Sequence, residues 1–189
     1  MEKKEHIIQS AQILFAQFGL KKVTTDDIAR EAHVSKATIY KFFKNKNEIF
    51  DMVLQAETDQ LITAIREAVD KKTEVSEKLK AHLMTRLGKV QEFVNFYRVT
   101  QDTWGDYWPY IKHVRQEFLE AEKGVVRDIL AQGVRRNELK VENLEMAAHV
   151  LIVALASLEF QWALDEYDIS LETMVDGMLE MMMHGICRS

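Results

Sequence analysis

A helical spacing of apolar residues recurs along almost the whole chain, and few residues that break helices interrupt it. Only one proline and seven glycines occur among the 189 residues. So few turn-forming residues argue against a β-fold with many turns and favour long helices. In residues 171–186 apolar side chains recur at every position expected for one face of a helix: Leu171, Met174, Val175, Met178, Leu179, Met182 and Ile186. The sequence predicts an all-α protein of about nine helices.

Residues 23–50 predict two short helices joined by a tight turn, followed by the start of a third. Thr24, Thr25 and Asp27 can accept hydrogen bonds from the free N–H groups of a first helical turn. Ser35 is the N-cap candidate of the second short helix. This pattern is typical of a helix-turn-helix.

In the second short helix, Ile39 and Phe43 are four residues apart and can pack inward. The other face carries ammonium, hydroxyl and phenol groups, which suit the DNA major groove because the groove admits one helix. The candidate DNA contacts are Thr24, Thr25, Ser35, Lys36, Ala37, Thr38, Tyr40, Lys41 and Lys46. The pattern alone also fits a solvated helical hairpin in an ordinary all-α protein.

Several residues of this segment match a known signature: Thr24-Thr25, Ile28-Ala29, Ala32, Val34-Ser35-Lys36, Thr38-Ile39-Tyr40, Phe43, Asn45-Lys46 and Glu48. Through them the chain resembles the TetR-type transcriptional regulators over roughly residues 7–50. The resemblance implies a three-helix DNA-binding domain, placed here at 1–46, and a helical ligand-binding and dimerisation domain at 47–189. One departure is His33, where such proteins usually carry glycine in the turn. Glycine takes positive φ freely, and histidine does so at some cost.

The charges divide unevenly along the chain. The formal net charge is −5, which is unexpected for a DNA-binding protein. Residues 1–50 nevertheless hold nine Lys/Arg against six Asp/Glu, and the remainder holds sixteen against twenty-four. The basic excess therefore lies with the helix-turn-helix, where phosphate contacts need it.

The remaining segments predict longer helices with identifiable ends. A first helix covers about residues 4–18 and stops at Gly19, and a fourth, capped by Asn45 or Asn47, continues to about residue 70. Further helices are expected over about 75–90, over about 91–103, and from the N-cap candidate Asp106 to about residue 136. Asn143 and Ser170 are the N-cap candidates of the last two. The long fourth helix can link the two domains.

Two site predictions concern the larger domain. The last two helices are the candidate homodimer interface, through Leu151, Ala154, Leu155, Leu158, Met174, Met178 and Met182. Their apolar stripes could instead fill the monomer core. An aromatic cluster with polar neighbours is the candidate site for an apolar or amphipathic effector. Its residues are Met84, Leu87, Phe93, Phe96, Tyr97, Arg98, Trp104, Tyr107, Trp108, Tyr110, His113, Phe118 and Phe160.

The expected function is a cytoplasmic, ligand-responsive repressor that binds a palindromic operator as a homodimer. No signal peptide or membrane span is expected, and neither is a cofactor or metal. The alternative is a helical small-molecule carrier or metal–carboxylate protein without DNA binding. The pairs Glu145/His149 and Glu180/His184 share helix faces, but no catalytic motif accompanies them. The single cysteine, Cys187, is interpreted as an incidental thiol.

Overall fold

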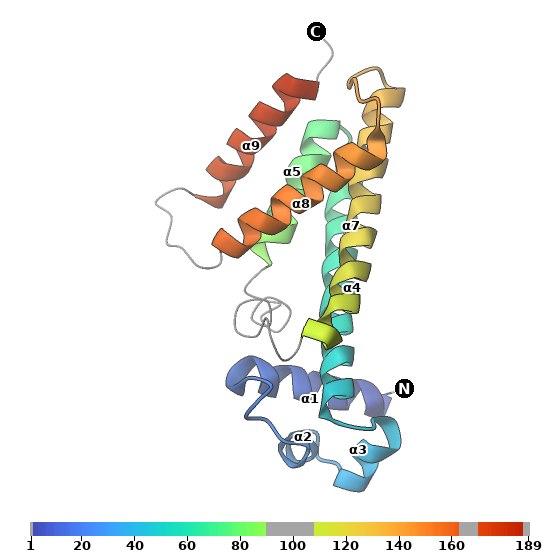
Figure 1. Cartoon of the computed structure of the whole chain (residues 1–189), viewed down its shortest axis with the longest axis vertical. Helices are drawn as coiled ribbons and strands as arrows, with labels where there is room; N and C mark the ends of the chain where they lie inside the picture. Colours follow the sequence, from blue (N-terminus) through green and yellow to red (C-terminus); the bar gives the residue numbers. More distant parts are fainter. Residues whose placement is uncertain (1, 90–107, 163–169, 187–189) are drawn as a thin grey trace. The chain divides into compact units, whose positions relative to one another are not determined.

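The computed structural model describes residues 2–89, 108–162 and 170–186, and these residues form α-helices without a strand (Figure 1). The helices are α1 (Glu2–Phe18), α2 (Thr25–Glu31), α3 (Lys36–Phe42), α4 (Lys46–Asp70), α5 (Val75–Gly88), α7 (Trp108–Arg135), α8 (Leu144–Trp162) and α9 (Leu171–Ile186). The predicted all-α class is confirmed. The helix expected over 91–103 lies outside the described residues. None of the described helices is both long and apolar enough to cross a bilayer.

The described residues form two compact units. The first unit contains residues 2–59 and the start of α7 at 108–115. The second contains residues 60–89, 116–162 and 170–186. Because α4 runs without a break from Lys46 to Asp70, it contributes to both units.

Side-chain caps set the beginnings of the two short helices in the first unit. At α2, the Asp27 N–H donates to Thr24 Oγ1 at 3.2 Å, and the Thr24 N–H donates to Asp27 Oδ2 at 3.0 Å. At α3, the Thr38 N–H donates to Ser35 Oγ at 3.1 Å. Each bond satisfies a backbone donor that the first helical turn leaves without a partner. The predicted starts at Thr24 and Ser35 are confirmed.

Apolar side chains from α1, α3 and α4 brace the first unit. The rings of Phe15 and Phe50 meet edge to face, with their centroids 5.2 Å apart. Ile7, Ile39 and Phe43 are also buried. The inward orientation that the sequence predicted for Ile39 and Phe43 is therefore observed, and it fixes which face of α3 remains outside.

The turn between α2 and α3 contains the one residue that departs from the expected signature. His33 has a φ of 51°, in the left-handed region, and its N–H donates to the Arg30 carbonyl at 3.2 Å. The following N–H, of Val34, donates to the Ala29 carbonyl at 2.9 Å. The turn therefore keeps the geometry that favours glycine while carrying a side chain, at a conformational cost.

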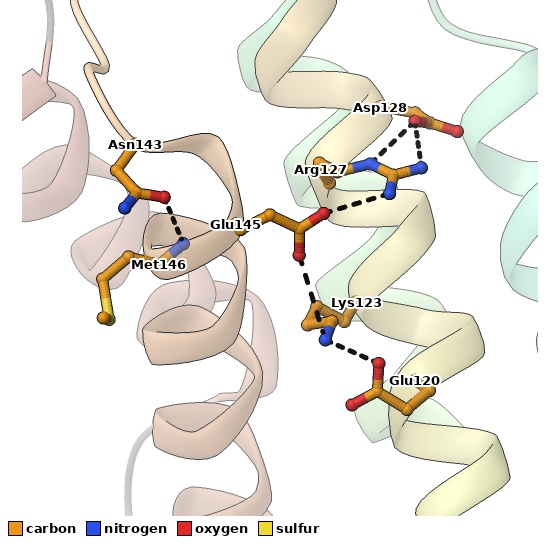
Figure 2. A network of polar contacts seen from close by, with 7 residues as sticks. All are labelled: Glu120, Lys123, Arg127, Asp128, Asn143, Glu145 and Met146. Atoms are coloured by element: carbon orange, nitrogen blue, oxygen red, sulfur yellow. Dashed lines mark hydrogen bonds and ion pairs between the residues drawn. The ribbon is translucent and has the colours of Figure 1, made fainter.

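In the second unit a polar network ties the start of α8 to α7 (Figure 2). Glu145 of α8 accepts from Arg127 at 3.1 Å, and its other oxygen lies 3.9 Å from the Lys123 ammonium. Asn143 caps α8, accepting from the Met146 N–H at 2.9 Å. Met146 points away from α7, on the other side of the helix from Glu145.

The strained turn gives a first prediction. His33→Gly should raise the free energy of unfolding by about 0.5–1 kcal/mol, because the left-handed penalty of about 1–2 kcal/mol exceeds the entropy that glycine loses on folding. Urea denaturation measures the change. His33→Ala is the control, since it removes the imidazole but keeps the Cβ. An equal gain in both variants would trace the effect to the imidazole and contradict the prediction.

Candidate nucleic-acid interface and ligand cavity

The outer face of α3 presents the side chains that the sequence analysis selected for DNA contact. Ile39 and Phe43 hold the inner face in the core, so the other positions are directed outward. The candidates divide by exposure: Thr24, Ser35, Lys36, Ala37, Tyr40 and Lys41 are exposed, whereas Thr25, Thr38 and Lys46 are half-buried. The fold therefore brings all nine candidates into the first unit, and the α3 residues among them form one continuous surface.

Polar links connect this surface of α3 to α2. The Lys36 ammonium lies 2.9 Å from an Asp26 carboxylate oxygen, and the Tyr40 and Thr25 hydroxyls are 3.5 Å apart. The hydrogen bond and the charge of Asp26 raise the pKa of Lys36. Sequence analysis missed Asp26, which is ten positions before Lys36 and becomes its neighbour only when the turn forms.

Lys46 has a position that the sequence did not predict. Its Nζ donates to the Leu20 carbonyl at 2.6 Å and to the Val23 carbonyl at 2.8 Å. Partial burial lowers the pKa of this ammonium. The side chain thereby ties the first residue of α4 to the connection between α1 and α2. A phosphate contact by Lys46 remains a prediction, but in this arrangement two of its three N–H donors are already used.

A small apolar cavity, partly open to solvent, lies in the second unit between α5, α7, α8 and α9. Its volume is about 170 Å³. The walls are almost entirely apolar and include flexible methionines; they are formed by Leu79, His82, Leu83, Val126, Leu151, Ala154, Leu155, Met178, Met181 and Met182. An apolar cavity of about 150 Å³ can hold a benzene molecule. This cavity suits a hydrocarbon group of similar size.

A fully buried cluster of ionisable side chains joins α5 to α7 beside the cavity. One oxygen of the Glu122 carboxylate forms an ion pair with the Arg86 guanidinium, and the other oxygen lies 3.0 Å from His82 Nε2. The three side chains are at most 1% exposed. Burial, together with the Arg86 charge, lowers the pKa of His82 to about 3. His82 is therefore neutral at pH 7.

The Arg86 guanidinium also lies over the Phe118 ring, 4.8 Å from its centroid. Such a cation–π contact gives the buried cation a second favourable partner. Sequence analysis selected Phe118 as a ligand contact but missed the charged cluster. A signal was present, because His82 and Arg86 occupy apolar-stripe positions of α5, between Leu79, Leu83 and Leu87.

The residues predicted for the effector site have varied positions. Phe118 and Leu87 are buried, Met84 is half-buried and His113 is exposed, and none of the four lines the cavity. Phe93, Phe96, Tyr97, Arg98, Trp104 and Tyr107 lie outside the described residues. The same holds for the side chains of Trp108, Tyr110 and Phe160.

Most residues predicted for the dimer interface meet at the cavity. Leu151, Ala154, Leu155, Met178 and Met182 line it, whereas Met174 is half-buried elsewhere on α9 and the Leu158 side chain is not described. Their role in dimerisation remains a prediction. Glu145, considered above as half of a metal pair with His149, is held by Arg127 and Lys123. The described residues contain no group of three or more metal-ligating side chains.

Comparison with known proteins assigns the helix-turn-helix. Residues 7–53, which contain it, match the family described as bacterial regulatory proteins, tetR family. These residues form a TetR-type DNA-binding domain. The chain is a transcriptional regulator, and the matches indicate no enzyme family.

Relatives match nearly the whole chain. The HTH-type transcriptional regulator YhgD of Bacillus subtilis is 26% identical, over 96% of this chain and 94% of its own length. The fatty acid metabolism regulator protein of the same organism is 24% identical, over 97% and 95%. The crystal structure of FadR from Bacillus subtilis in complex with stearoyl-CoA is 22% identical and has a TM-score of 0.77. The structural alignment covers 96% of this chain and 98% of the FadR chain. The structural likeness establishes a shared fold.

The buried histidine makes stability depend on pH. Between the ordinary pKa of 6.5 and the folded value of about 3, the unfolded chain binds a proton that the folded protein excludes. Stability should therefore fall on acidification by about 1.4 kcal/mol per pH unit below pH 6.5. Urea denaturation should show the wild type losing about 1.5 kcal/mol more than His82→Gln between pH 6.5 and 5, because the unfolded histidine is only half protonated at pH 6.5. Equal losses of stability in the two proteins would contradict the lowered pKa of His82.

Proposed function

We propose that this protein is a repressor that binds a palindromic operator as a homodimer and is released by an effector with an aliphatic chain. Residues 1–46 would bind DNA, and residues 47–189 would bind the effector and the second copy. The proposal joins three features: the outer face of α3, an exposed apolar stripe on α8, and the apolar cavity.

The observation that carries the proposal is the outer face of α3. Lys36, Tyr40 and Lys41 are exposed on a short helix whose other side is anchored by Ile39 and Phe43. A recognition helix needs this combination, because its polar side chains must reach base edges and phosphates without disturbing the core. The matched family gives the same helix-turn-helix a DNA-binding role.

The homodimer is supported by an apolar stripe on α8. Met146, Val150 and Val153 follow one another at four- and three-residue spacing, and each is more than half exposed. Glu145, on another side of this helix from Met146, is tied to α7 (Figure 2), and the three side chains of the stripe remain exposed. A second copy of this surface would cover the stripe. Pairing also supplies two recognition helices for two half-sites, which raises affinity for a palindrome.

The effector class is supported by the cavity and by one relative. The cavity walls are almost purely apolar, and the only ionisable side chain among them, His82, is engaged with Glu122. The related FadR of Bacillus subtilis has been crystallised with stearoyl-CoA. An acyl chain is therefore the proposed ligand group. Three methionines in the walls can rearrange to admit a chain longer than the present volume holds.

Coupling between the two sites would pass through α4. This helix begins at Lys46, beside the helix-turn-helix, and ends at Asp70 in the second unit. Lys46 fastens its first turn to the α1–α2 connection. An effector can shift the DNA-binding equilibrium only by its differential affinity for the two states, typically about 1–3 kcal/mol.

DNA binding is tested by titrating the protein against duplexes from its own upstream region at several salt concentrations. The logarithm of the affinity should fall linearly with the logarithm of the salt concentration. Lys41→Gln should make this slope shallower by about 0.9, the value expected for one lost phosphate contact. Lys140→Gln is the matched control, because it removes the same charge from an exposed position after α7. A folded wild type without salt-dependent binding would reject the proposal.

Effector binding is tested with stearoyl-CoA, stearate and free CoA as probes. Stearoyl-CoA should bind and lower the affinity for DNA, whereas CoA alone should do neither. Val126→Phe places a ring in the cavity and should weaken stearoyl-CoA binding about 10-fold or more, with DNA affinity unchanged. Val134→Phe makes the same change on α7 away from the cavity walls and serves as control. Equal effects of both variants on ligand affinity would place the site elsewhere.

A further inference from the structure

The cavity opens to solvent between α8 and α9. Its walls from α5 and α7 are buried: Leu79, His82, Leu83 and Val126. Apart from the buried Leu155, its walls from α8 and α9 are half-buried or exposed: Leu151, Ala154, Met178, Met181 and Met182. We call these five residues the mouth of the cavity. Met181 is 73% exposed, so a ligand in the cavity meets solvent at the mouth.

An apolar stripe on each of the two helices borders the mouth. On each helix three apolar side chains follow one another at four- and three-residue spacing: Met146, Val150 and Val153 on α8, and Met174, Met178 and Met181 on α9. Ala154 of the mouth directly follows Val153. This spacing is the one by which helices pack in coiled coils and four-helix bundles. A second copy of the same two helices therefore matches this surface, as the proposed homodimer requires.

The cavity is too small to enclose a long acyl chain together with its head group. A cavity of about 150 Å³ holds benzene, so the volume of about 170 Å³ has room for about six carbons. None of the described residues that line it is a lysine or an arginine that could pair with a carboxylate or a phosphate. An anionic head group therefore stays outside the cavity, at the mouth, where water solvates it.

A head group at the mouth conflicts with a second copy packed on the two stripes. Burying an unpaired charge in an apolar contact is costly, so the two copies cannot close over the mouth while the head group occupies it. The effector consequently binds a single chain more tightly than it binds the dimer. By linkage, its binding weakens the dimer.

We propose that the effector and the second copy compete for the surface around the mouth, so that an aliphatic effector with an anionic head group releases the repressor by separating the two copies. The inference rests on the proposed function and adds to the coupling through α4. A single chain presents one recognition helix, so separation removes the affinity that a palindrome gives to a pair.

The first test is sedimentation equilibrium of the full-length protein without DNA, with stearoyl-CoA kept below the concentration at which it forms micelles. If each cavity binds stearoyl-CoA about 10-fold more weakly in the dimer, saturation should raise the dimer Kd about 100-fold, because the dimer has two cavities. Free CoA should leave the Kd unchanged. Val126→Phe fills the cavity and should abolish the response, whereas Val134→Phe, away from the cavity walls, should retain it.

The reciprocal test measures stearoyl-CoA binding by a chain that cannot pair. Val150→Gln combined with Val153→Gln makes the α8 stripe polar without adding charge or changing a cavity wall. This variant should be monomeric and should bind stearoyl-CoA about 10-fold more tightly than the wild-type dimer does. Ile13→Gln combined with Phe18→Gln, at exposed positions of α1, is the matched control and should change neither property.

Four results would overturn the inference. Bound stearoyl-CoA leaves the dimer Kd unchanged or lowers it, the variant with the polar α8 stripe stays dimeric, or that variant is monomeric but binds stearoyl-CoA no more tightly than wild type. In the fourth, Val126→Phe keeps the full response, which traces the effect to the amphiphile and not to the cavity.

Failure of the proposed function looks different from failure of this inference. Without ligand the wild type would then be monomeric, or stearoyl-CoA would fail to bind it, and either result removes both proposals. A dimer that persists while stearoyl-CoA lowers the affinity for DNA leaves the proposed function standing and removes this inference alone.

Discussion

The second unit depends on one buried cluster of ionisable side chains, in which Glu122 of α7 lies between Arg86 and His82 of α5. Taking the charges of Glu122 and Arg86 out of water is costly, and leaving either without its partner costs more. The cluster therefore restricts how α5 and α7 can pack against each other. The cavity lies beside this contact, with His82 in its wall, so the same cluster that fixes the two helices also limits the shape of the space available to an effector.

The first unit is organised by shorter-range interactions. Thr24 and Ser35 set the starts of α2 and α3, and Ile39 sets which side of α3 is buried. These features are local, which explains why a short sequence signature is enough to specify a recognition surface. Lys46 adds a longer-range tie, between the start of α4 and two carbonyls before α2. The outer face of α3 and the beginning of α4 are consequently both held in place by contacts within the first unit.

Much of the fold was predictable because helix starts and stops are encoded by neighbouring residues. Asn143, Ser170 and Gly19 each occupy the terminal position predicted for them. The buried charges were also visible in principle, since His82 and Arg86 interrupt an apolar stripe at positions that must face inward. Their partner could not be inferred, because any acidic residue of another helix might have met them. The cavity was not predictable for the same reason: five of the residues predicted for the dimer interface line it, and apolar spacing alone does not show which helices enclose a space.

The sequence by itself determined the helical class, most helix ends and the outward face of α3, since each follows from interactions within about four residues. The tertiary structure alone decided the pairing of Asp26 with Lys36, the use of Lys46 as a backbone tie, and the burial of Glu122 between Arg86 and His82. Those contacts join residues 10 to 40 positions apart. The physical reason is that apolar spacing specifies that a helix face is buried, whereas the partner of a particular side chain depends on how the helices pack.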